Sequence, residues 1–174
     1  GLDIIAVLPA RPGDPILAGL QDIGLNIYAV PVTGAVRTNL AITEPDGTTT
    51  KLNEPGSVME SADIDALTRA VLECAQSAQW VVLSGSLPPG MPEGWYADMV
   101  AALRPYPSKV AVDTSESPLA ALAHHLDRAA PDLIKPNAEE LAGLAGVTAQ
   151  SLESAVARGD AGPVVIAAQR LIAR

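Results

Sequence analysis

The sequence contains no phenylalanine, a single cysteine and few aromatic residues of any kind. Aromatic residues make up 3% of its 174 residues, whereas apolar residues make up 48%. The core must therefore be built from Leu, Val, Ile and Ala, and the composition is that of a globular domain rather than a disordered segment. A lone cysteine excludes an internal disulfide, and the apolar neighbours of Cys74 indicate a core-facing position on a helix.

Basic residues are also scarce. Lys and Arg number 11 against 20 Asp and Glu, which gives a formal net charge of -9. This acidic balance argues against nucleic acid or an anionic membrane as the main partner, but a locally positive pocket can still bind an anionic small substrate. There is no apolar run long enough to span a bilayer and no visible signal peptide, so we expect a cytoplasmic protein.

Both ends of the sequence lie close to regular patterns. Gly1 leads directly into a strand-like run at residues 3–8, and residues 164–174 form a helical pattern that stops without a capping glycine. Natural domains seldom begin and end inside their elements. We therefore expect the chain to be the central part of a larger domain.

Strand-length apolar runs alternate with helical patterns along most of the chain. We expect strands at 4–8, 26–32, 80–83, 110–112 and 133–134, and helices at 14–23, 61–78, 92–103, 118–129, 138–144, 152–158 and 164–174. Asp14 and Ser61 are the expected N-caps of the first two helices. Repeated β-loop-α units predict an α/β fold with a mainly parallel sheet and helices on both faces.

Residues 36–53 depart from this alternation of strands and helices. Their apolar residues recur with a period of two, and the run is interrupted by the turn sequence Glu44-Pro45-Asp46-Gly47. This pattern predicts a β-hairpin that forms a small lid. Residues 1–35 and 54–174 would then belong to the α/β domain.

The loop from Ser84 to Gly90 directly follows an expected strand. Ligands bind in such loops at the carboxyl ends of parallel strands. Gly85 and Gly90 have the spacing of a phosphate-binding Walker A loop, but Met91-Pro92 stands where that loop requires Lys-Ser/Thr, so the motif is excluded. Two interpretations remain: an ordinary turn, or a loop in which Ser86 bonds a sugar hydroxyl or a phosphate.

A second such loop runs from Lys135 to Leu141. Asn137 and Glu140 have the spacing of a helix capping box, which is a purely structural role. The same two side chains at a helix N-terminus could instead hold Mg²⁺ through its waters, beside nucleotide phosphates. Both interpretations stay open.

Three further features carry weaker signals. Arg37 and Asn39 share one face of a strand, where Arg can grip a phosphate and Asn a sugar hydroxyl, although a solvated hairpin face would look the same. Asp113 also follows a strand and is either a site carboxylate or a helix cap. His124 and His125 have no ligand spacing and are expected to be structural.

Taken together, these segments resemble the ribokinase/PfkB family of sugar kinases. The resemblance runs in order through Arg37-Thr38-Asn39, Lys51-Leu52-Asn53-Glu54-Pro55-Gly56, Leu83 to Gly90, Val112-Asp113-Thr114 and Lys135 to Leu141. It implies a ribokinase-like fold and ATP-dependent phosphorylation of a ketose phosphate. Fructose 1-phosphate is the substrate it favours, with tagatose 6-phosphate or fructose 6-phosphate as alternatives.

The resemblance also implies roles for individual residues. Arg37 would bind the phosphate of the sugar phosphate, Asn39 would lie near the sugar, and Ser86 would face the substrate. Lys135, Asn137 and Glu140 would bind ATP, with Asn137 and Glu140 positioning Mg²⁺ through water. The hairpin would cover the sugar and pair with a second subunit in a homodimer.

One feature of the family is missing from the sequence. Family members carry a Gly-x-Gly-Asp loop whose Asp deprotonates the attacking hydroxyl, and no Gly-x-Gly-Asp occurs here. The family's sugar-binding Asp on an initial strand and its adenine-binding part are also not found. We therefore expect a chain without its catalytic base and with little activity, or else a non-catalytic α/β domain that binds sugar phosphate.

Overall fold

The computed structural model describes residues 3–172 and divides into two compact units. The first comprises the residues up to Cys74 together with Pro88–Met91, and the second comprises Ala75–Leu87 and the residues from Pro92 onward.

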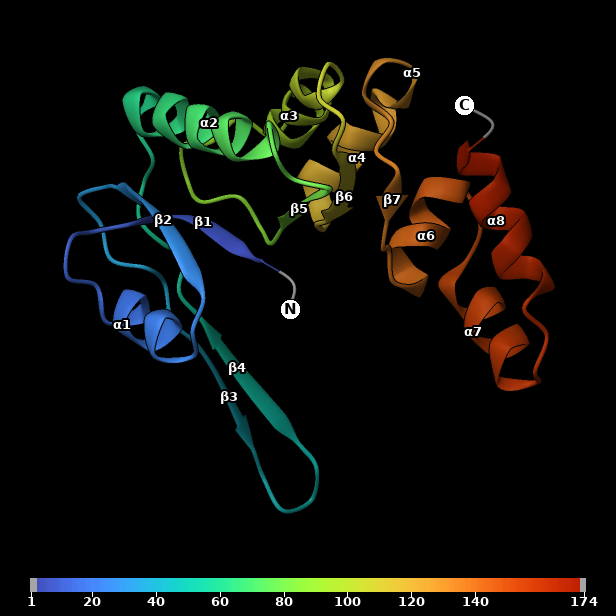
Figure 1. Cartoon of the computed structure of the whole chain (residues 1–174). Coiled ribbons are helices and arrows are strands. Elements are labelled where there is room, and N and C mark those ends of the chain that lie inside the picture. The colour runs from blue at the N-terminus through green and yellow to red at the C-terminus, as the bar shows by residue number, and fades with distance from the viewer. Residues whose placement is uncertain (1–2, 173–174) are drawn as a thin grey trace. The chain divides into compact units, whose positions relative to one another are not determined.

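The first unit begins with a β-α-β element. Strand β1 (Ile5–Ala10) pairs in parallel with β2 (Asn26–Pro31), and helix α1 (Pro15–Asp22) connects them (Figure 1). Asp14 caps α1 as expected, because its Oδ1 accepts a hydrogen bond from the Ile16 amide at 3.2 Å. Its Oδ2 accepts another from the Val36 amide, also at 3.2 Å. One buried carboxylate therefore ties the start of α1 to the segment that leads to Arg37.

The predicted hairpin is confirmed, but it begins at Asn39, so Arg37 precedes the strand and does not share a strand face with Asn39 as expected. Strands β3 (Asn39–Thr43) and β4 (Thr49–Asn53) pair antiparallel, and every residue of both strands is exposed. Leu40 lies opposite Leu52 and Ile42 opposite Thr50, so the pleat places these side chains on one face of the ribbon.

Helix α2 (Ser61–Ala75) follows the hairpin and corrects one expectation. Ser61 is its first helical residue rather than its N-cap. The start is fixed instead by Asp63, whose Oδ2 accepts a hydrogen bond from the Glu60 amide at 3.1 Å. The expected apolar face of this helix is buried at Leu67 and Val71.

The second unit contains a parallel three-stranded sheet in the order β5-β6-β7. Strands β5 (Trp80–Ser84), β6 (Lys109–Asp113) and β7 (Leu133–Ile134) lie side by side in Figure 1. Helix α3 (Trp95–Leu103) connects the first two strands, and it buries Met99 and Leu103 almost completely. Because the strands run parallel, the loops after Ser84, Asp113 and Ile134 emerge at the same edge of the sheet.

The connection from β6 to β7 differs from the expected single helix. It consists of α4 (Glu116–His124) and the short α5 (Leu126–Ala129), separated by His125 with φ -121° and ψ 20°. The helical pattern at 118–129 is therefore interrupted at His125, where the backbone leaves the helical region.

Three helices complete the unit. The apolar side chains of α6 (Ala138–Ala145), α7 (Ala149–Ala157) and α8 (Gly162–Ile172) form one cluster around Leu141 and Leu152. None of the helices within residues 3–172 combines the length and the apolar character required to cross a membrane. The expected fold class, an α/β protein with parallel strands and a small hairpin, is confirmed.

Candidate functional site

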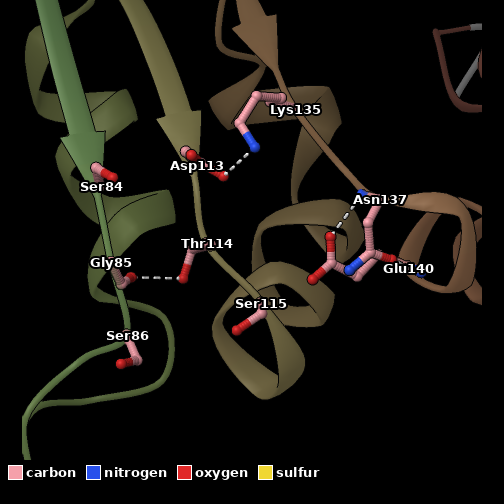
Figure 2. A pocket seen from close by; sticks show the side chains of 9 residues that line it. All are labelled: Ser84, Gly85, Ser86, Asp113, Thr114, Ser115, Lys135, Asn137 and Glu140. Atoms are coloured by element: carbon pink, nitrogen blue, oxygen red, sulfur yellow. Dashed lines mark hydrogen bonds and ion pairs between the residues drawn. The ribbon is translucent and has the colours of Figure 1, made fainter. Parts of the chain in front are cut away.

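A polar pocket of about 330 Å³ lies where the three parallel strands of the second unit end. Its walls come from the loops after β5, β6 and β7 and from the first turn of α6 (Figure 2). The lining residues are Ser84, Gly85, Ser86, Asp113, Thr114, Ser115, Lys135, Asn137 and Glu140. The pocket therefore lies at the carboxyl ends of the parallel strands, and almost all of its lining side chains are polar.

The loop after β5 is held in a conformation that requires glycine. Gly85 has φ +104°, a backbone angle that residues with a Cβ rarely adopt. Its amide donates to the Asp113 carbonyl at 2.9 Å, which extends the β5-β6 ladder by one residue. Ser86 follows immediately and lines the pocket.

Lys135 and Asp113 form an ion pair across the pocket. Lys135 Nζ lies 3.2 Å from Asp113 Oδ1, and the side chains are 74% and 42% exposed. Such an exposed pair contributes at most about 1 kcal/mol to stability. The pair therefore leaves the ammonium accessible to an incoming anion, such as a phosphate.

Asn137 and Glu140 form the capping box that their spacing predicts. Asn137 Oδ1 accepts from the Glu140 amide at 2.9 Å, and Glu140 Oε2 accepts from the Asn137 amide at 2.8 Å. The structural role is thus confirmed, and it also fixes where both side chains point. Figure 2 shows the carboxylate of Glu140 at the helix N-terminus, beside the pocket opening.

The charges of the lining residues favour a cation in one part of this pocket. Asp113 and Lys135 neutralise each other, so Glu140 leaves the lining with one net negative charge. Only one carboxylate oxygen of Glu140 is occupied by the capping box. One carboxylate and one amide suit a Mg²⁺ ion that keeps most of its waters and is shared with phosphate oxygens.

Arg37 and Asn39 belong to the first unit and do not line this pocket. Arg37 lies beside Gly56. If Gly56 carried a methyl side chain, its Cβ would be 3.7 Å from both Cβ and Cδ of Arg37. The adjacent Thr38 amide donates to Glu54 Oε2 at 2.8 Å. The structure therefore brings Arg37 together with the Glu54-Pro55-Gly56 stretch, although the two are well separated in sequence.

A comparison with protein families gives a match that is consistent with the order of these loops and with the fold. Residues 3–168 match the model of the pfkB family carbohydrate kinases. The chain belongs to the pfkB family.

Individual relatives of this pfkB-family chain are named as 1-phosphofructokinases. It is 43% identical over 124 residues to a 1-phosphofructokinase of Rhodobacter capsulatus, which covers 70% of this chain and 38% of that protein. It is 37% identical over 121 residues to a 1-phosphofructokinase of Vibrio cholerae, covering 70% of this chain and 37% of that protein. The chain thus spans well under half the length of these relatives.

A solved structure shows the same fold. Escherichia coli phosphofructokinase-2, crystallised with substrates and products, superimposes with a TM-score of 0.73 at 27% sequence identity, covering 83% of this chain and 47% of that chain. The ribokinase-like architecture expected from the sequence is therefore shown for this pfkB-family chain.

Sequence reasoning missed part of the pocket in this family member. Ser84, Thr114 and Ser115 line it, although the sequence does not mark them as site residues, and the sequence alone does not decide the role of Asp113. The structure excludes Asp113 as the cap of α4, because Ser115 occupies that position. Thr114 could have been found from its position, because it directly follows the end of β6 at Asp113, just as Gly85 directly follows the end of β5 at Ser84.

Proposed function

We propose that this chain supplies the substrate-facing part of an ATP-dependent kinase that converts fructose 1-phosphate to fructose 1,6-bisphosphate. The observation that carries this proposal is the convergence of Ser86, Lys135, Asn137 and Glu140 on one pocket at the strand ends. Its two named 1-phosphofructokinase relatives support the choice of sugar phosphate.

Different residues of the chain would have different roles in phosphoryl transfer. Lys135 and Asn137 would bind the phosphates of ATP, and Ser86 would orient the sugar. Arg37 would hold the phosphate that the sugar already carries, with Asn39 near the sugar itself. Phosphoryl transfer depends mainly on such positioning and on stabilising negative charge.

In the reaction, the substrate hydroxyl oxygen would form a bond to the γ-phosphorus of ATP. The bond from that phosphorus to the bridging oxygen would break, ADP would leave, and the hydroxyl proton would pass to a base. Mg²⁺, when bound, would neutralise charge on the phosphates. Asn137 and Glu140 would hold it through water, and the capping box keeps both side chains oriented for that task.

The base is proposed to come from outside residues 1–174. No Gly-x-Gly-Asp occurs in the sequence. We therefore expect no phosphoryl transfer from ATP to fructose 1-phosphate by this chain alone in a coupled ADP-release assay. Turnover above background would show that a residue within the chain serves as base.

The substrate is tested on the full-length protein with a panel of sugar phosphates. We expect kcat/KM to be highest for fructose 1-phosphate and lower for fructose 6-phosphate and tagatose 6-phosphate. A preference for either of the other two would replace the proposed substrate. If none is phosphorylated while sugar phosphate still binds, the alternative of a non-catalytic sugar-phosphate-binding domain is correct.

The hairpin is proposed to act as a lid over the sugar and as a contact in a homodimer. Its apolar residues Leu40, Ile42 and Leu52 are each more than half exposed, which a second subunit would cover. A cytoplasmic location would give such a kinase its ATP and Mg²⁺. The dimer is tested by comparing the sedimentation of the wild type with that of a Leu40→Ser, Leu52→Ser variant. A monomeric wild type would contradict the proposal.

A further inference from the structure

The carbonyl oxygen of Gly85 accepts hydrogen bonds from two hydroxyls that belong to different elements. The Tyr96 hydroxyl on α3 lies 2.8 Å away, and Thr114 Oγ1, just after β6, lies 2.9 Å away. Figure 2 shows the bond from Thr114 beside the polar pocket. Tyr96 does not line that pocket, and Thr114 lines it without being among the residues that the family resemblance assigns to a substrate.

Both donors are held firmly in place. Tyr96 is 4% exposed and Thr114 is 6% exposed, although the loop they contact is open to solvent. The Tyr96 ring packs edge-on against Trp95, with ring centroids 5.4 Å apart. Burial raises the pKa of Tyr96 to about 12, so the hydroxyl stays protonated and remains a donor at every pH at which a kinase works.

The two hydroxyls act on a peptide unit that leads into the pocket. The peptide between Gly85 and Ser86 is planar and trans, so fixing the carbonyl of Gly85 also fixes the direction of the Ser86 amide. The Gly85 amide is tied to Asp113 on the other side. Gly85 needs such support, because glycine has more accessible backbone conformations than any other residue.

We propose that Tyr96 and Thr114 are positioning residues, which together hold the Gly85–Ser86 peptide and thereby set where Ser86 meets the sugar phosphate. This inference rests on the proposed function, since it assigns the two hydroxyls a role in substrate placement. A purely structural role would instead make them contribute to folding and leave substrate selectivity unchanged.

The test compares Tyr96→Phe, Thr114→Val and the double variant in the full-length protein. Each single variant leaves one donor on the carbonyl, so we expect kcat/KM for the sugar phosphate to fall only about threefold to tenfold. The double variant removes both donors, and we expect its loss to exceed the product of the single losses. KM for ATP should change less than about twofold, because Lys135 and Asn137 lie on other loops.

Three controls separate positioning from a loss of stability. Tyr106→Phe removes a tyrosine hydroxyl in the turn before β6, at the opposite end of that strand, and should leave kinetics unchanged. Thr114→Ser restores the hydroxyl and should recover the activity lost in Thr114→Val. The ratio of variant to wild-type kcat/KM should be constant from about pH 6 to pH 9, because Tyr96 does not titrate there.

Hydrogen exchange gives a readout that does not depend on the reaction. Mass spectrometry of peptides spanning 84–87 should show faster amide exchange in the double variant, whereas peptides from α6 should be unchanged. Unchanged exchange at 84–87, or equal losses in KM for both substrates, overturns the inference. If the wild type phosphorylates no sugar phosphate, the proposed function fails, and the exchange data still decide whether the two hydroxyls hold the loop.

Discussion

Replacing Glu140 by Gln separates its structural role from its proposed role at a metal ion. Gln accepts a hydrogen bond from the Asn137 amide as Glu140 Oε2 does, so the capping box survives. The substitution removes one negative charge at the start of α6. That charge contributes about 0.3–1 kcal/mol to helix stability through the helix dipole.

The expected effects on stability and on metal binding differ in size. A loss of up to about 1 kcal/mol lowers Tm by no more than about 4 °C in a chain of this length. By contrast, Glu140 is the one carboxylate of the pocket lining that is not paired with Lys135. A divalent ion about 4 Å from one carboxylate gains roughly 2 kcal/mol in a water-like dielectric, which corresponds to a change of at least tenfold.

The assay is the Mg²⁺ dependence of the rate in the full-length protein at saturating ATP. We expect Glu140→Gln to raise the Mg²⁺ concentration for half-maximal rate on the order of tenfold and to lower kcat. Glu139→Gln is the matched control. Glu139 lies in the same first turn but does not line the pocket, so it should reproduce the change in Tm without the change in Mg²⁺ dependence. Equal Mg²⁺ dependence in the two variants would refute the reasoning and leave Glu140 as a helix cap.

Two further substitutions test other parts of the chain. Arg37→Ala in the full-length protein should raise KM for the sugar phosphate roughly tenfold to a hundredfold, because a charge-assisted phosphate contact is lost. KM for ATP should be nearly unchanged. Lys51→Ala, which removes a cation from the hairpin, serves as the control. Equal effects on KM for both substrates would assign Arg37 another role. Ser108→Ala should raise Tm by about 2–4 °C, because the buried Oγ of Ser108 makes no hydrogen bond within residues 3–172 and its removal relieves a desolvation cost of about 1 kcal/mol. A lower Tm of the Ser108→Ala variant, measured by calorimetry, would contradict the expected relief of this desolvation cost.

The elements and much of the pocket could be predicted because their signals are local. The period-two pattern around Glu44-Pro45-Asp46-Gly47 specifies the hairpin, and the spacing of Asn137 and Glu140 specifies the capping box that forms. The place of Ser86 after an expected strand marks it as a candidate, the family resemblance assigns a role to Lys135, and the structure places both on the same pocket. These features depend on residues close to one another in the chain or on recognisable motifs.

The rest could not be predicted because it depends on three-dimensional contacts. Tyr96 sits in an apolar stretch with no polar pattern, and only folding brings its hydroxyl to the carbonyl of Gly85. The break between α4 and α5 falls at His125, where no proline or glycine marks it. Asp113 is ambiguous in sequence because a carboxylate at a strand end suits both a cap and a site, and its ion pair joins the end of β6 to Lys135, which follows β7.

The exposed hairpin has a consequence for how the protein behaves in concentrated solution. Among the residues that the structure describes, β3 and β4 pair only with each other, so each strand presents an outer row of backbone groups. Such edges are templates for another strand and promote aggregation, especially beside exposed Leu and Ile side chains. Lys51, in the middle of β4, opposes this stacking by charge repulsion. High salt, which screens that charge, should therefore favour precipitation through the hairpin.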